Sequence, residues 1–162
     1  MIKLSILTIG IFFSIVLSYF LMPTIVLNTL PDCKVSTVFI KEEKNRTVVS
    51  KGVWTYKYLG SRGVGRYNGQ LTYVPVEDGK SSTQNVSLSF ETDNNIFGPI
   101  IKTKTTDFSL SHDNRAELQD IIKYVYKGLE PAHVNFNRIQ LINNALYTSG
   151  INTFQPRTTC WK

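Results

Sequence analysis

The stretch Lys51–Val74, KGVWTYKYLGSRGVGRYNGQLTYV, contains two runs of alternating residues separated by a glycine-rich segment. Trp54, Tyr56 and Tyr58 recur at every second position, which is typical of a β-strand with one buried face. Gly60–Gly65 is predicted to be a hairpin loop, because it lacks the Gly-Lys-Ser/Thr ending and the following helix of a phosphate-binding loop. The two runs therefore predict a β-hairpin with an aromatic inner face.

Similar alternation predicts strands on both sides of this hairpin. In one of them Val86, Leu88 and Phe90 are expected to point inward. Turns are predicted at Glu42–Arg46, Asp78-Gly79, Asp93–Asn95 and Asn143-Asn144. The predicted strands are Val35–Lys41, Thr47–Leu59, Arg66–Val76, Gln84–Thr92, Gly98–Thr106, the irregular Val134–Leu146 and the short Ile151–Phe154.

One helix is predicted between these strands. Asn114 and Glu117 have the spacing of a capping box, and Gly128 is expected to end the helix. The apolar residues behind the cap repeat at helical spacing: Leu118, Ile121, Ile122 and Val125. The predicted fold class is α+β, mainly antiparallel β, with six or seven strands in an open or closed barrel. The helix is expected to pack across one opening or one side.

The run Leu4–Met22 has no charged residue and is about as long as a membrane-spanning helix. It is too long for the apolar region of a signal peptide and lacks a clear cleavage site. A retained anchor is therefore favoured over a cleaved signal or a buried soluble helix. Lys3 favours a cytoplasmic amino end. We predict a cytoplasmic start at 1–3, a transmembrane anchor with a short linker at 4–30, and an extracytoplasmic β-rich domain at 33–162.

Two cysteines, Cys33 and Cys160, lie at the two ends of this domain. In an oxidising compartment they predict one disulfide, which is favoured over a redox switch or a metal site. The net charge of +6 is scattered along the chain. This pattern argues against direct nucleic-acid binding and suits an acidic protein surface or anionic lipid headgroups better.

No nucleophile–base pair or metal signature is apparent, so no catalytic residue, metal site or cofactor is predicted and the chain is not expected to be an enzyme. His112 and His133 flank the predicted helix and could sense pH, although solvated loop histidines are the favoured interpretation. The aromatic face could form either the barrel core, which is favoured, or the wall of a pocket for a small amphipathic ligand. Its residues are Trp54, Tyr56, Tyr58, Tyr67 and Tyr73.

The layout of a short start, one apolar run and a basic β-rich domain with two terminal cysteines resembles the FidL-like, PsaF–MyfF family of small inner-membrane accessory proteins. Lys51–Val74 resembles the strand–glycine loop–strand core of that family. The resemblance implies a single-pass inner-membrane protein with a periplasmic, lipocalin-like barrel that a partner sometimes completes. It also implies binding and stabilisation of the periplasmic domain of a membrane-bound ToxR-like transcription activator controlling fimbrial or virulence genes. The alternative is a lipocalin-like periplasmic ligand-binding or sensor protein.

Overall fold

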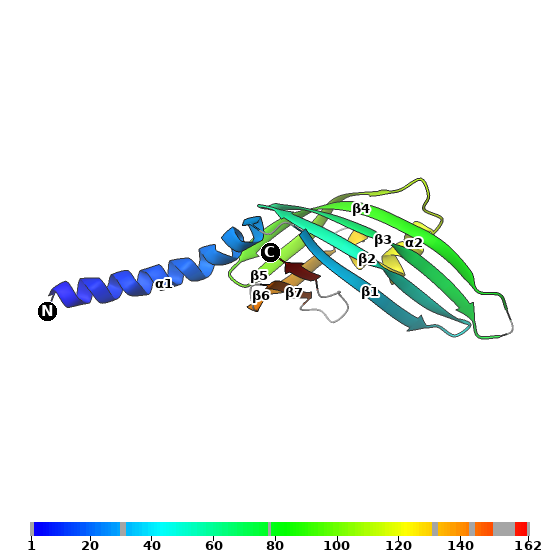
Figure 1. Ribbon diagram of the computed structural model, residues 1–162, viewed down its shortest axis with the longest axis horizontal. Helices are drawn as coiled ribbons and strands as arrows, with labels where there is room; N and C mark the ends of the chain where they lie inside the picture. The colour runs from blue at the N-terminus through cyan, green and yellow to red at the C-terminus, as the bar shows by residue number, and fades with distance from the viewer. Residues whose placement is uncertain are drawn as a thin grey trace.

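Eight antiparallel strands form a ring in which each strand pairs with its neighbours in sequence and the last returns to the first (Figure 1). This computed structural model describes residues 2–29, 32–77, 79–130, 133–142, 145–150 and 158–161. The strands are β1 (Asp32–Glu42), β2 (Arg46–Leu59), β3 (Arg62–Pro75), β4 (Ser82–Phe97), β5 (Ile100–Leu110), β6 (Val134–Ile142), β7 (Ala145–Gly150) and β8 (Thr158–Trp161). The mainly antiparallel, barrel-like fold is thus confirmed.

Among the described residues, strand pairing closes the ring at one end. β1 pairs with β8 over Asp32–Lys34, and β5 pairs with β6 over Ile100–Lys104. Beyond these short pairings, β1 to β5 continue as a curved sheet that forms a half-barrel (Figure 1). We call the fully paired end, which lies beside the first helix, the narrow end, and the opposite end the wide end.

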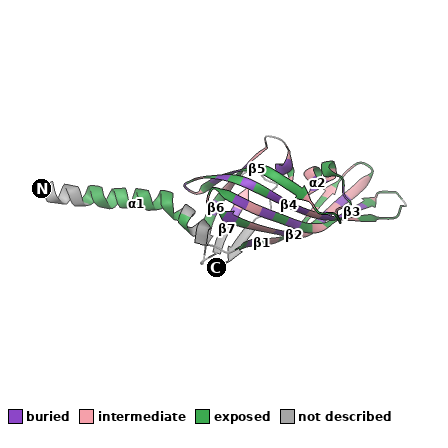
Figure 2. Cartoon of the chain, turned by 90° about the horizontal axis from the view of Figure 1, so that it is seen from above, coloured by how far each residue is buried: buried purple, intermediate pink, exposed green. Residues whose placement is uncertain are grey.

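The alternation in sequence matches the alternation in burial. Trp54 and Tyr58 of β2 are buried while Lys57 between them is exposed. β4 repeats the pattern, with Val86, Leu88 and Phe90 buried and their neighbours more exposed. Figure 2 shows buried and exposed positions alternating along the long strands. The predicted inner faces of these two strands are therefore confirmed.

The predicted loop at Gly60–Gly65 is wrong. The observed turn contains only Gly60 and Ser61, and β3 begins at Arg62. Gly63 and Gly65 lie inside β3, where a Cβ would collide with the ring of Tyr56 or Phe90. These glycines therefore make room for aromatic rings that lie across the strands, a common use of glycine in curved sheets.

The predicted turn at Asp93–Asn95 is also wrong, because all three residues lie within β4. The side chain of Asn94 points into the barrel, where its Nδ2 donates a hydrogen bond to Tyr56 Oη at 3.0 Å. This buried partner offsets the usual preference of asparagine for turns. The chain instead reverses at Gly98, whose φ of +55° is readily adopted by glycine.

The predicted helix is shorter than expected. Helix α2 covers Leu118–Tyr124, and the 3-10 turn η1 covers Lys127–Leu129, which includes Gly128. The expected capping box is absent: Glu117 is the N-cap and makes no side-chain cap hydrogen bond. Asn114 Nδ2 donates to the carbonyl of Ala116 at 2.8 Å instead, so its amide is used in a local turn before the helix.

The predicted segment Val134–Leu146 is divided into β6 and β7. The predicted strand Ile151–Phe154 and the turn at Asn143-Asn144 lie outside the described residues, as does Asp78. Cys33 is buried, disulfide-bonded and in direct register with Cys160 across β1 and β8. The register therefore brings together the two cysteines that were predicted to pair.

Helix α1 covers Ile2–Thr29 and projects away from the strands (Figures 1 and 2). Its described side chains are mostly apolar and exposed over much of their length, including Phe12 and Phe13. The sequence predicts a membrane span over Leu4–Met22, within the anchor and linker at 4–30. Among the described residues, no helix has the combined length and hydropathy required to cross a membrane.

Candidate functional site

The wide end is filled by aromatic rings and α2. The rings of Trp54 and Tyr67 have centroids 4.7 Å apart, and Tyr126 packs against both Trp54 and Phe90. Ile121 of α2 is fully buried against this cluster. The interior of the half-barrel is therefore packed with side chains here. Residues of α2 supply packing contacts that further strands would provide in a fully closed barrel.

The five residues of the predicted aromatic face lie inside the barrel. Tyr58 belongs to a small cluster at the narrow end with Cys33 and Ile101, and the other four join the larger cluster. This placement fits the core interpretation, whereas a pocket for a small amphipathic ligand stays a prediction. Trp54, Tyr67 and Tyr73 are buried members of the larger cluster, and Tyr56 packs against both clusters.

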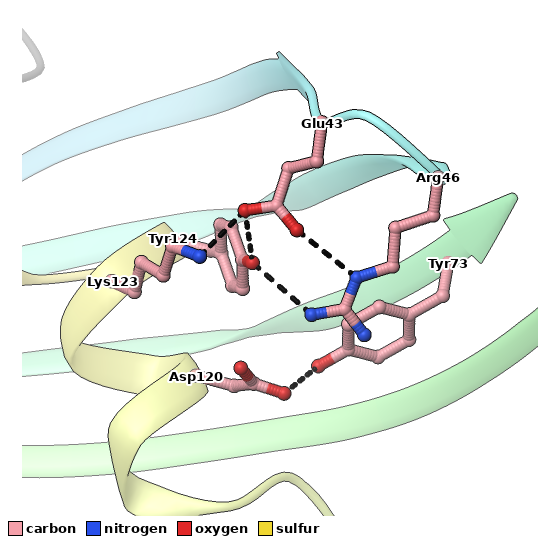
Figure 3. A network of polar contacts seen from close by, with 6 residues as sticks. All are labelled: Glu43, Arg46, Tyr73, Asp120, Lys123 and Tyr124. Atoms are coloured by element: carbon pink, nitrogen blue, oxygen red, sulfur yellow. Dashed lines mark hydrogen bonds and ion pairs between the residues drawn. The ribbon is translucent and has the colours of Figure 1, made fainter.

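A polar network fastens α2 to the turn between β1 and β2 (Figure 3). Lys123 Nζ and Tyr124 Oη donate to Glu43 Oε1 at 2.6 and 2.7 Å. Arg46 Nε donates to Glu43 Oε2 at 3.1 Å, so both oxygens of this carboxylate are occupied. We call this network the α2 latch; it consists of Glu43, Arg46, Tyr73, Asp120, Lys123 and Tyr124.

The latch also has a contact on β3. Tyr73 Oη donates to Asp120 Oδ2 at 2.6 Å, and the Arg46 guanidinium lies 4.8 Å from the centre of the Tyr73 ring. Burial and the neighbouring Asp120 carboxylate raise the pKa of Tyr73, so its hydroxyl stays a donor. Two charged residues of α2 are thus held at two different places, Asp120 by β3 and Lys123 by the turn between β1 and β2.

The latch stabilises the ionised form of Glu43. Hydrogen bonds from Lys123, then Tyr124 and Arg46, lower the pKa of the Glu43 carboxyl to about 2. The charged forms of its partners are stabilised as well, since the hydrogen bond to Glu43 raises the pKa of both Arg46 and Lys123. Glu43, Arg46 and Lys123 are therefore all charged at neutral pH.

The far side of the α2–η1 segment contacts β5 and β6. Tyr126 Oη lies 3.4 Å from Thr105 Oγ1, and Asn135 Nδ2 donates to the same hydroxyl at 3.4 Å. Burial raises the pKa of Tyr126, which keeps this phenol neutral. The segment therefore bridges the opening of the wide end, with Tyr124 at one wall and Tyr126 at the other.

The outer edge of β1 is the clearest surface for a partner. Beyond Lys34, β1 pairs with β2 on one side and with no described strand on the other. Val38 and Ile40 lie on the exposed face of this strand, and their side chains are 62% and 61% exposed. An unpaired edge with apolar side chains is a template for an added strand. We call Val35–Glu42 the β1 edge.

The two predicted pH-sensing histidines occupy different settings. His112 is exposed just after β5, whereas His133 is half-buried just before β6. The Nε2 atom of His133 lies 2.9 Å from Asn135 Oδ1, and its Nδ1 lies 4.0 Å from Glu130 Oε2. Neither histidine belongs to the α2 latch, and a role in pH sensing stays a prediction.

Sequence reasoning missed the latch because its members were assigned to separate features. Glu43 and Arg46 fall within the predicted turn at Glu42–Arg46, whereas Lys123 falls within the predicted helix. A metal centre is not apparent either, since no three His, Cys, Asp or Glu residues gather within the part of the chain that the structure describes. No protein-family model matches the chain, and no curated protein matches it significantly.

Proposed function

We propose that this chain is an inner-membrane accessory protein that binds and stabilises the periplasmic domain of a membrane-bound ToxR-like transcription activator. The activator would control fimbrial or virulence genes, and this chain would contact no nucleic acid and catalyse no reaction. The β1 edge is the observation that carries the proposal, since it offers backbone hydrogen-bonding groups beside two exposed apolar side chains.

Strand addition suits the shape of the wide end. The sheet from β1 to β5 is long, while its closure by β6 to β8 is confined to the narrow end. A strand from the activator could extend the sheet at the β1 edge, with backbone hydrogen bonds supplying affinity and Val38 and Ile40 supplying apolar contacts. The partner would also cover an edge that otherwise invites aggregation.

The proposal places α1 in the inner membrane and the barrel in the periplasm. Its support is the uncharged run Leu4–Met22 and the exposed apolar side chains of α1. Two chains anchored in one bilayer meet at a high effective concentration, so an edge contact of modest affinity suffices. The oxidising periplasm is also compatible with the disulfide at Cys33.

Co-purification of the full chain with the periplasmic domain of its activator tests this function. The variant Val38→Lys/Ile40→Lys should weaken the complex by about tenfold or more, because two apolar contacts are replaced by edge charges. Val76→Lys is the matched control: Val76 is 66% exposed but lies beyond the end of β3. Equal binding by the wild type, the edge variant and the control would contradict a role for the β1 edge.

A further inference from the structure

The rim of the narrow end exposes large apolar side chains. Phe97, the last residue of β4, is 72% exposed, and Ile100 begins β5 on the other side of the turn at Gly98 and Pro99. Leu59 occupies the corresponding position at the turn between β2 and β3 and is 52% exposed. We call Leu59–Arg62 and Phe97–Ile100 the narrow-end rim. Exposed apolar side chains gathered on adjacent turns indicate a surface that meets another phase or partner.

The narrow-end rim touches the end of the apolar run in α1. The rings of Phe20 and Phe97 lie edge to face with their centroids 5.7 Å apart, and Tyr19 lies beside Gly98. Met22, where the run ends, is two positions after Phe20. With a rise of about 1.5 Å per residue, Phe97 therefore lies within about 3 Å, along the helix axis, of that end. Any bilayer that covers the run would reach Phe97 as well.

Cations surround the rim. Lys57 and Arg62 flank the first turn, and Lys102 and Arg138 lie beside the second, with Arg138 in register opposite Ile100. All four are exposed. The acidic residues nearest these cations are Asp32, Glu91 and Asp93; Asp93 is in register with Arg62, and Glu91 is level with Lys57 across β3. In the described pairings Lys102 and Arg138 face no acidic residue, so the excess positive charge of the rim lies beside its second turn.

We propose that the narrow-end rim docks on an anionic lipid surface, with Phe97 inserted at the headgroup level and the four cations among the lipid phosphates. Apolar side chains ringed by Lys and Arg are the composition that binds such interfaces. The proposal rests on the placement of α1 in the membrane under the proposed function. It adds that the barrel stands on the bilayer by its narrow end and presents the β1 edge away from the lipid.

Fluorescence quenching by brominated lipids tests the contact on the full chain reconstituted into vesicles. Phe97→Trp places a reporter in the rim, and Val76→Trp places one at a similarly exposed apolar position of the wide end. In phosphatidylglycerol vesicles, the signal added by Phe97→Trp should be quenched about threefold more than that of Val76→Trp. Quenching is expected only for a tryptophan that enters the bilayer interface, where docked apolar side chains reach a depth of ~5–10 Å.

The charge dependence is tested in the Phe97→Trp background. Lys102→Gln/Arg138→Gln should lower the ratio of docked to undocked rims on the order of thirtyfold, because each lost cation weakens attraction to the anionic surface. Lys44→Gln/Lys80→Gln removes two exposed cations from the wide end and should change nothing. Salt at about 1 M should abolish the excess quenching, since screening then acts over about 3 Å.

Equal quenching of Phe97→Trp and Val76→Trp would overturn the proposal, as would equal quenching in phosphatidylcholine and phosphatidylglycerol. A chain that fails to float with vesicles of either composition would overturn both the anchor and the docking. The partner assay separates the remaining case: if quenching is absent but the activator still co-purifies, the lipid contact is wrong while the accessory function stands.

Discussion

The two ends of the barrel are held together in different ways. At the narrow end the backbone closes the ring through short pairings, and the interior contains the buried polar residues Thr92 and Asn94 beside the half-buried Tyr56. These groups satisfy one another: Tyr56 Oη hydrogen-bonds to both Thr92 and Asn94, and burial raises its pKa to about 12. At the wide end no described strand closes the gap between β1 and β5, and side chains of α2 and η1 complete the enclosure.

The two ends therefore depend on different stabilising contacts. The narrow end depends on chain connectivity, because β1 and β8 meet across almost the whole length of the domain. The wide end depends on packing and on the α2 latch, which are local to one short helix. A helix of two turns is not stable by itself, so α2 is ordered by its contacts. The wide end is therefore the region where the fold is most easily opened.

The largest effect is expected from removing the covalent tie at the narrow end. Cys33→Ser/Cys160→Ser should lower the free energy of unfolding by about 3–5 kcal/mol, because a loop of more than a hundred residues is no longer closed in the unfolded chain. Urea denaturation of the full chain in detergent measures this. Reductant should destabilise the wild type to the same degree and leave the variant unchanged; a wild type insensitive to reductant would contradict the predicted pair.

The packing of α2 should have the next largest effect. Ile121→Ala should cost about 3 kcal/mol, because a fully buried side chain is truncated against aromatic neighbours. Leu118→Ala on the same helix removes an exposed side chain and should cost under about 0.5 kcal/mol. Amide hydrogen exchange should show Ile121→Ala opening the wide end before the narrow end. Uniform exchange across both ends would show that they are one cooperative unit.

The smallest effect is expected from the pH response of the latch. The pKa of Glu43 is lower in the folded chain than its ordinary value of 4.5, so its contribution is complete above 4.5 and is lost as pH falls toward about 2. Glu43→Gln should therefore lower the melting temperature slightly at neutral pH but make little difference near pH 2. Glu42→Gln, an exposed neighbour, is the control. A difference between wild type and Glu43→Gln that persists to the lowest pH would rule out this mechanism.

The strand pattern was predictable because it depends on neighbours two residues apart in sequence. Trp54, Tyr58 and Leu88 show the buried alternation that their positions indicate. The sequence predicts a loop at Gly65, because the reason for a glycine there is not local. Gly65 makes room for the ring of Phe90, which lies opposite it on the next strand. Local preference for turns at glycine and asparagine is overridden where a cross-strand partner fills the space or satisfies the polar group.

The α2 latch could not be predicted for a related reason. Glu43 and Lys123 are eighty positions apart, and no spacing rule links a turn residue to a helix residue at that separation. The sequence does place an acidic and a basic residue three apart in the turn, which is the local part of the network. The part of β1 with no described strand on its outer side was equally hidden, because it follows from where the described pairing with β8 ends rather than from the composition of β1.

The ring topology also fixes an order of assembly. Each pairing from β1 to β7 joins consecutive strands, and most of these hairpins can form while the chain is still lengthening. The contact between β1 and β8 joins the two ends of the domain, so its loop-closure entropy makes it a late step. Until then the whole of β1 is open on its outer side. How much of the outer side of β1 is covered is thus decided late in folding, when the four-residue strand β8 pairs with it.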